Sequence, residues 1–169
     1  MTAPTEGAAA NRSPMARLEQ LLAAQESLLV EMRAALQGER AAMEALDAEA
    51  LEQAAQAKAG IAAELRLVED ARIVVARELA RTLGIGDDAP TLTQLCARLG
   101  ADGARLLGAR DRLRALVTGN AELLEANSTF ATRSLDEVRT TLEWIGNLVP
   151  RAPTYERAGQ VTASRPSGG

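Results

Sequence analysis

Residues 113–149 read LRALVTGNAELLEANSTFATRSLDEVRTTLEWIGNLV, a stretch without proline that keeps one periodic apolar stripe over its whole length. Eighteen residues make about five turns of an α-helix, so a side chain returns to the same direction after that interval. By this count Asn120 lies over Val138, and Asn127 lies over Ile145. The stretch therefore predicts one long helix with two asparagines inside its buried apolar stripe.

Two more long helices are predicted upstream of this stretch. Ser13 followed by Pro14 is a favoured helix start, and leucines recur from there at mostly three- and four-residue steps to about residue 46. Asp47 can cap a second helix, whose apolar stripe continues to the connection GIGDDAP at residues 84–90.

A short helix is predicted between the second and the last long helix. Thr91 and Gln94 have the spacing of a capping box, in which each side chain accepts a hydrogen bond from the other residue's backbone amide. This box opens a helix of about eight residues, and Gly100 to Gly103 form a turn or bend after it. Pro150 then ends the last helix.

Long amphipathic helices with short connections can bury their apolar stripes against one another or against a partner. We therefore expect an all-α fold, an elongated antiparallel three-helix bundle or coiled coil with a short extra helix in its second connection. The predicted organisation is a disordered tail at 1–12, a bundle over 13–149 with helices at about 14–46, 48–83, 92–99 and 104–148, and a mobile tail at 150–169.

The composition argues against several classes of function. Of the 169 residues 47% are hydrophobic and 2% aromatic, and the formal net charge is −4, which argues against a nucleic-acid interface. The sequence has no histidine and one cysteine, Cys96, so it lacks the usual general base and the usual soft-metal ligands. We expect no catalytic residue, no metal and no cofactor, and we expect Cys96 to be a small buried hydrophobic side chain.

The sequence also bears on location and on nucleotide binding. No signal peptide is recognisable and no stretch approaches about 18 uninterrupted apolar residues, so we expect a soluble cytoplasmic protein with no direct membrane insertion. Gly84, Gly86 and Ala89 match the loosest form of the dinucleotide fingerprint. That fingerprint follows a strand, whereas a helix precedes it here, so a helix-ending loop is the better interpretation.

The apolar surface widens near the end of the last helix. Phe130, Trp144 and Leu148 lie to one side of the apolar stripe. Either the first or second helix covers this flank, or the flank and the stripe receive a helix from another protein. The candidate residues for contact with such a helix are Asn127, Phe130, Leu135, Val138, Leu142, Trp144, Ile145 and Leu148.

Asn127, Phe130, Ser134-Leu135, Val138 and Leu142 recur along the last helix with a characteristic spacing. This spacing resembles the last-helix signature of FlgN-type flagellar export chaperones. The tail is similar to the family's as well, since Pro153-Thr154-Tyr155 precedes Gly159-Gln160-Val161 by three residues. Glu156 departs from the usual glycine after the tyrosine, and Phe130-Ala131 replaces a pair of aliphatic residues.

The resemblance implies a cytoplasmic chaperone of flagellar type III export. Its partners would be hook-filament junction proteins of the FlgK and FlgL kind, bound through their C-terminal helices, and an FlhA-like export gate protein. Leu135, Val138, Leu142 and Ile145 would belong to the cargo-binding region, and Tyr155 would match the tyrosine associated with gate docking.

Three alternatives stay open on the sequence. The nearest is another flagellar chaperone of the FliT type. A structural coiled-coil homodimer or scaffold protein is the second, in which the asparagines would fix the register between chains. An enzyme is the weakest, because no activating base is present.

Overall fold

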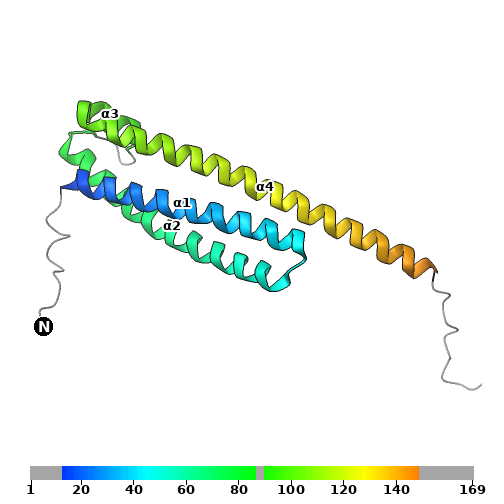
Figure 1. Ribbon diagram of the computed structural model, residues 1–169. Coiled ribbons are helices and arrows are strands. Elements are labelled where there is room, and N and C mark those ends of the chain that lie inside the picture. Colours follow the sequence, from blue (N-terminus) through cyan, green and yellow to red (C-terminus); the bar gives the residue numbers. More distant parts are fainter. Residues whose placement is uncertain (1–12, 87–89, 149–169) are drawn as a thin grey trace, which may run out of the picture. The chain divides into compact units, whose positions relative to one another are not determined.

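The structure is a computed structural model that describes residues 13–86 and 90–148, and helices make up most of this part of the chain (Figure 1). Strands are absent from these ranges, and the prediction of an all-α protein is confirmed. The predicted tails lie outside the described residues. The elements are α1 (Pro14–Ala45), α2 (Ala48–Thr82), α3 (Leu92–Leu99), the 3₁₀ helix η1 (Gly100–Asp102) and α4 (Gly103–Leu148).

The chain divides into two compact units, Met1–Ala131 and Thr132–Gly169. The first contains α1, α2, α3, η1 and the part of α4 up to Ala131, and the second contains the rest of α4. The bundle over 13–149 stays a prediction, and the two units are described one at a time.

Local capping residues determine where the helices begin. The Ser13 hydroxyl accepts a hydrogen bond from the Ala16 amide at 3.3 Å, and the Asp47 carboxylate accepts one from the Ala50 amide at 3.0 Å. The capping box predicted at Thr91 is present, with both of its reciprocal bonds. Each cap satisfies an amide that the first helical turn leaves without a partner.

The connection between α1 and α2 turns at a leucine. Leu46 has a φ of 55°, in the left-handed region, and its side chain is 90% exposed. Its amide still bonds to the Met43 carbonyl at 3.3 Å and closes the last turn of α1. Glycine is the usual residue at such a helix end, because a Cβ atom in this conformation approaches the backbone.

The best-packed core lies where α3 closes the end of the first unit. Leu18, Leu22, Leu95 and Leu106 are essentially inaccessible to solvent there. Cys96 is buried in the same cluster, as predicted. Burying a leucine fully contributes about 1.5–3 kcal/mol, so this end of the unit supplies much of its stability.

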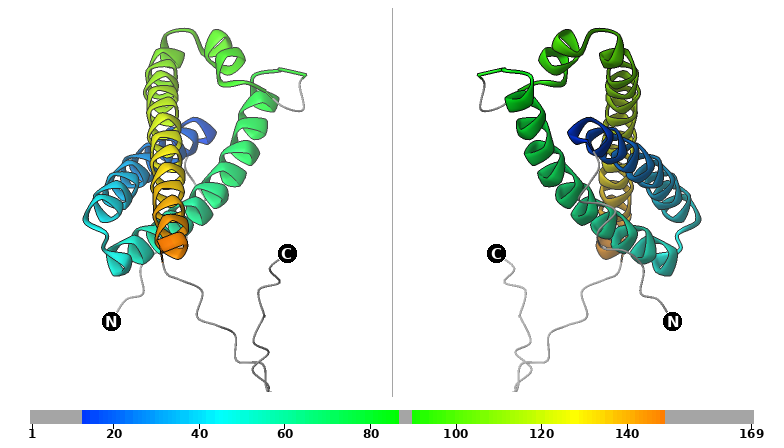
Figure 2. Two further views of the ribbon diagram at one scale, coloured as in Figure 1. Left: turned by 90° about the vertical axis from the view of Figure 1, so that its right-hand side faces the viewer. Right: turned by 90° about the vertical axis from the view of Figure 1, so that its left-hand side faces the viewer.

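A close backbone approach joins α3 to α4. A Cβ atom at Gly103 would lie 2.5 Å from the carbonyl oxygen of Cys96 and 2.8 Å from its Cα. Side chains larger than hydrogen therefore do not fit at position 103 unless the backbone moves. Figure 2 shows α3 between the end of α2 and the start of α4.

α1 and α2 form an antiparallel hairpin. Arg17 near the start of α1 pairs with Glu78 near the end of α2 at 2.9 Å, and Glu39 near the end of α1 pairs with Lys58 of α2. Between these pairs Gln25 donates to Glu69 at 2.7 Å.

The first part of α4 lies along α1 and runs in the same direction. Glu19 of α1 pairs with Arg105 at 3.9 Å, and one heptad later Glu26 pairs with Arg112 at 2.8 Å. This direction is the one expected of the third helix after an antiparallel hairpin. None of the helices in the described ranges is both long enough and apolar enough to cross a bilayer.

Candidate functional site

The last part of α4 exposes a row of large apolar side chains. Leu135, Val138, Leu142 and Ile145 are 69%, 56%, 62% and 44% exposed. They recur at steps of three, four and three residues, which places them on one face of the helix. We call these four side chains the C-terminal row. All four are among the residues that the sequence singled out for cargo binding.

Trp144 and Leu148 extend this apolar surface around the helix. They are 63% and 59% exposed. At about 100° per residue, Leu148 points about 100° and Trp144 about 140° from the centre of the C-terminal row. The large apolar side chains are therefore spread over about half of the circumference, more than a helix needs for one contact, and Glu137 and Thr141 point into the same half.

The polar side chains of this segment make short-range hydrogen bonds. Arg139 bonds to Glu143 one turn along the helix at 3.1 Å, and two threonine hydroxyls donate to carbonyls of the preceding turn at 2.9 Å each. The threonine pairs are Thr140 with Asp136 and Thr141 with Glu137. These interactions stay within the helix and involve none of the apolar side chains.

Asn127 faces α1 in the first unit. It is 4% exposed, and its amide nitrogen donates to the Leu36 carbonyl at 2.8 Å and to the Glu39 carboxylate at 3.0 Å. The sequence predicted both its burial, which is confirmed, and a role in cargo binding. Its side chain is already held between two helices, so it acts on the position of α4 against α1.

Asn120 makes the equivalent contact one heptad earlier. It is 7% exposed and donates to the Leu29 carbonyl at 2.8 Å, while Arg33 donates to its oxygen at 3.4 Å. Both asparagines thus bond to carbonyls that are themselves seven residues apart, Leu29 and Leu36. A slip of α4 along α1 by one turn would break both bonds, so the pair fixes the register of the two helices.

Phe130 lies at the border of the first unit and is only partly covered. The guanidinium carbon of Arg40 lies 3.9 Å from the centre of its ring, the geometry of a cation–π contact. Arg40 also pairs with Glu44 at 2.6 Å. A ligand that uses the Phe130 ring face therefore displaces or joins this arginine.

Glu39 is an acidic residue of α1 that bonds to both Lys58 and Asn127. Partial burial opposes its ionisation, but hydrogen bonds from Lys58 and Asn127 and the charge of Lys58 outweigh burial and lower the pKa of its carboxyl group. The carboxylate thus stays charged at neutral pH and ties α1 to both α2 and α4. Burial raises the pKa of the Cys96 thiol, which keeps it protonated and unreactive.

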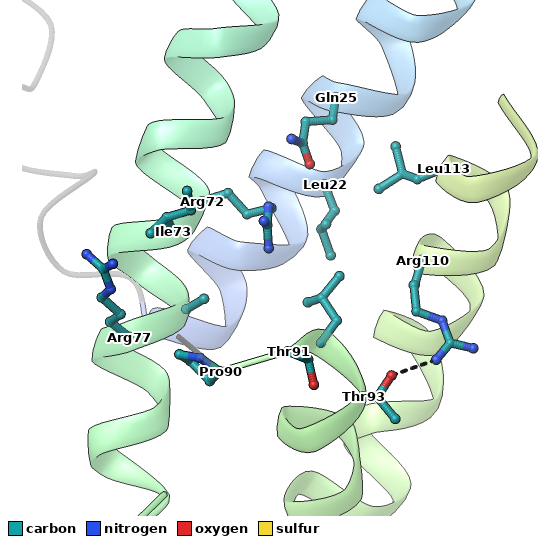
Figure 3. A pocket seen from close by; sticks show the side chains of 12 residues that line it. Leu22, Gln25, Arg72, Ile73, Arg77, Pro90, Thr91, Thr93, Arg110 and Leu113 are labelled. Carbon is teal, nitrogen blue, oxygen red and sulfur yellow. Dashed lines mark hydrogen bonds between the residues drawn. The ribbon is translucent and has the colours of Figure 1, made fainter. Parts of the chain in front are cut away.

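A groove between α2 and α4 is a feature that the sequence did not reveal. Its floor is α1, and three adjoining hollows of about 550, 460 and 500 Å³ make up its length. Figure 3 shows the hollow at the α3 end, with Leu22 and Leu113 inside it and Arg110 bonded to Thr93 at 2.9 Å. Helical periodicity indicated which side chains face inward, but not that α2 and α4 stand apart.

Tyr155, proposed for gate docking, lies outside the described residues, so its position is not described. The segment 87–89, which contains part of the GIGDDAP connection, lies outside them too. The glycine before it ends α2 as expected of a helix-ending loop, because Gly84 has a φ of 67°.

Comparison with known proteins supplies the family. Among curated proteins and solved structures there is no match to this chain. A family model described as "FlgN protein" matches residues 15–163, which include α1 from its second residue, the whole of α2, α3 and α4, and Tyr155. The match confirms the family that the last helix and the tail predicted. The protein belongs to the FlgN family of flagellar export chaperones.

Proposed function

We propose that this protein binds the C-terminal helices of hook-filament junction proteins of the FlgK and FlgL kind in the cytoplasm. It keeps these proteins from assembling prematurely and delivers them to an FlhA-like export gate. Binding of export cargo follows from the family. The particular cargo, the gate protein and the residues that contact them are the proposal.

The observation that carries this proposal is the exposed C-terminal row. Four large aliphatic side chains on one helix face, with Leu148 and Trp144 farther around the same helix, match the way in which an amphipathic helix is recognised. Such a contact gains about 25 cal/mol per Å² of buried apolar surface, less the cost of ordering the cargo segment. We assign direct cargo contact to these six residues.

Asn127 and Phe130 have a different part in the proposal. Asn127 holds α4 against α1 at the point where the exposed segment begins, and Phe130 offers a ring face once Arg40 moves. We assign gate docking to Tyr155 on the family resemblance, and we assign the protein no catalytic role.

Trp144 provides the experiment, because it is the only tryptophan in the chain. A C-terminal segment of a junction protein, chosen without tryptophan, is titrated into the full-length protein while the emission of Trp144 is followed. We expect a shift to shorter wavelength as cargo covers the indole. Trp144→Ala should weaken binding by about 2 kcal/mol, roughly 30-fold, measured by calorimetry.

Two outcomes would redirect the proposal. A version of the protein ending at Pro150 should retain cargo, and loss of cargo only in this version places the site in the tail. A stable dimer in light scattering, without affinity for any junction protein, would instead favour the structural homodimer, which would bury the same exposed side chains.

A further inference from the structure

We propose that the groove between α2 and α4 is a second helix-binding surface, in the first unit, and that it takes an amphipathic helix with acidic residues at one end. Only the origin of the partner helix, an export cargo, rests on the proposed function. The C-terminal row belongs to the other unit and is not part of this surface.

The three hollows form one continuous groove because they share lining residues. Gln25 and Leu113 line both the first and the second hollow. Leu29, Leu65 and Val117 line both the second and the third. Along α1 the floor extends from Leu22 to Leu36, which is about 21 Å at about 1.5 Å per residue, or about four helical turns.

The groove is apolar and has room for large side chains at the end far from α3. Val117 and Leu124 of α4 line it there and are each 53% exposed, although both belong to the apolar stripe of their helix. Ala59 and Ala62 of α2 and Ala121 of α4 line the same hollow. Small residues on two walls leave space that leucine or phenylalanine side chains of a partner can fill.

The polar groups that line this hollow are bonded elsewhere. Lys58 pairs with Glu39, and Asn120 bonds to the Leu29 carbonyl and to Arg33. The partner therefore meets hydrocarbon at this end of the groove. An apolar surface of this length is a recurrent site for another helix.

The partner is a helix and not an extended strand. The floor and both walls of the groove are helices, whose backbone amides and carbonyls already bond within each helix. An extended segment in the groove would find no backbone partners, whereas a helix satisfies its own.

The charge of the groove changes along its length. At the α3 end the lining includes Arg72, Arg77 and Arg110 and no carboxylate, although Arg72 pairs with Glu69 and Arg110 with Asp111 beside the hollow. The middle hollow is lined by Arg66, Glu69 and Asp70, and at the opposite end Lys58 is the one charged lining residue and is paired with Glu39. A partner helix with carboxylates at one end is thus oriented with that end beside α3.

The test uses the full-length protein and two labelled synthetic helical peptides of about 18 residues. Both carry leucines on one face, and they differ only in having glutamates or lysines in the first turn. Fluorescence anisotropy gives the dissociation constants. We expect the glutamate peptide to bind more tightly, and Arg110→Glu to reverse the preference; comparing both peptides on both proteins cancels differences in peptide helicity.

A matched pair of α4 variants locates the binding. Ala121 and Ala126 are both exposed alanines of α4, and only Ala121 lines the groove. Ala121→Glu should weaken peptide binding by about tenfold or more, because it places a charge against the apolar lining, whereas Ala126→Glu should leave it within about twofold. Circular dichroism and unfolding midpoints show that each variant is folded.

Other outcomes overturn the proposal in distinguishable ways. If peptide binding is lost with Leu142→Asp and not with Ala121→Glu, the peptide occupies the C-terminal row and the groove is not a site. If the protein dimerises and Ala121→Glu abolishes the dimer, a second copy covers the groove. If junction-protein binding fails while the glutamate peptide still binds in the groove, the proposed function fails and this inference stands.

Discussion

Replacing Asn127 with alanine tests whether this residue fixes the register of α4 on α1. The substitution removes a neutral hydrogen bond to the Leu36 carbonyl and a bond to the charged Glu39 carboxylate. Such bonds contribute about 1 kcal/mol and about 1.5–3 kcal/mol respectively. Glu39 keeps Lys58 as a partner, so we expect the low end of the sum, a loss of about 2–3 kcal/mol in the free energy of unfolding.

Asn120→Ala provides the internal comparison. It removes one good bond to the Leu29 carbonyl and a long contact with Arg33, so we expect a loss of about 1 kcal/mol. Urea unfolding followed by circular dichroism measures both values, and Thr129→Ala serves as a control, because Thr129 is exposed on the same helix. For a chain of this size, Asn127→Ala should lower the melting temperature by about 5–10 °C.

Two results would refute this reasoning. One is an Asn127→Ala midpoint within about 0.5 kcal/mol of the wild-type value, which is the range of ordinary surface substitutions. The other is a larger loss from Asn120→Ala than from Asn127→Ala, since the structure gives Asn120 the weaker set of bonds.

Three further substitutions follow from local geometry. Gly103→Ala should lower the free energy of unfolding by about 2–3 kcal/mol, because the added methyl group meets the Cys96 backbone. Gly146→Ala is the control and should cause no such loss, because no atom lies within 4 Å of the added methyl group. Equal losses from the two substitutions would contradict this explanation. Leu46→Gly should raise the free energy of unfolding by about 1 kcal/mol by relieving a left-handed leucine, and a lower urea midpoint would show that the turn needs its side chain. Partial burial opposes ionisation of Glu39, but its hydrogen bonds outweigh burial and lower the pKa of its carboxyl group below the ordinary value of 4.5. The ionised carboxylate therefore stabilises the fold fully above about pH 4.5, and this stabilisation is lost as the pH falls through the pKa of the folded state. Glu39→Gln should flatten the acid side of the curve of stability against pH, and an unchanged acid slope would contradict this.

Much of the fold follows from signals that are local in the sequence. Ser13, Asp47 and Thr91 cap helices in the structure as predicted, because a cap involves only residues three positions apart. The burial of Asn120 and Asn127 also follows from helical periodicity alone.

Contacts between helices did not follow from the sequence. The carbonyls that the asparagines reach on α1 depend on the register of two helices, which periodicity does not determine. Val117 and Leu124 belong to the apolar stripe of α4, yet each is half exposed, because α2 and α4 leave a groove between them. The reason for glycine at position 103 lies in the packing of α3 against α4, which is a tertiary feature.

The proposed function depends on the C-terminal row. Leu142 lies in this row, and Glu143 points about 100° away from both Leu142 and Trp144, at about 100° per residue. Both side chains are exposed, so neither substitution disturbs a core.

The most direct test is the dissociation constant for the C-terminal segment of a junction protein, measured by calorimetry for Leu142→Asp and Glu143→Gln in the full-length protein. We expect Leu142→Asp to weaken binding by about 30-fold or more, because an unpaired carboxylate is placed in an apolar contact, and Glu143→Gln, which also changes the net charge by one, to change it by less than about threefold. Equal affinities for the two variants, with both folded, would contradict this expectation.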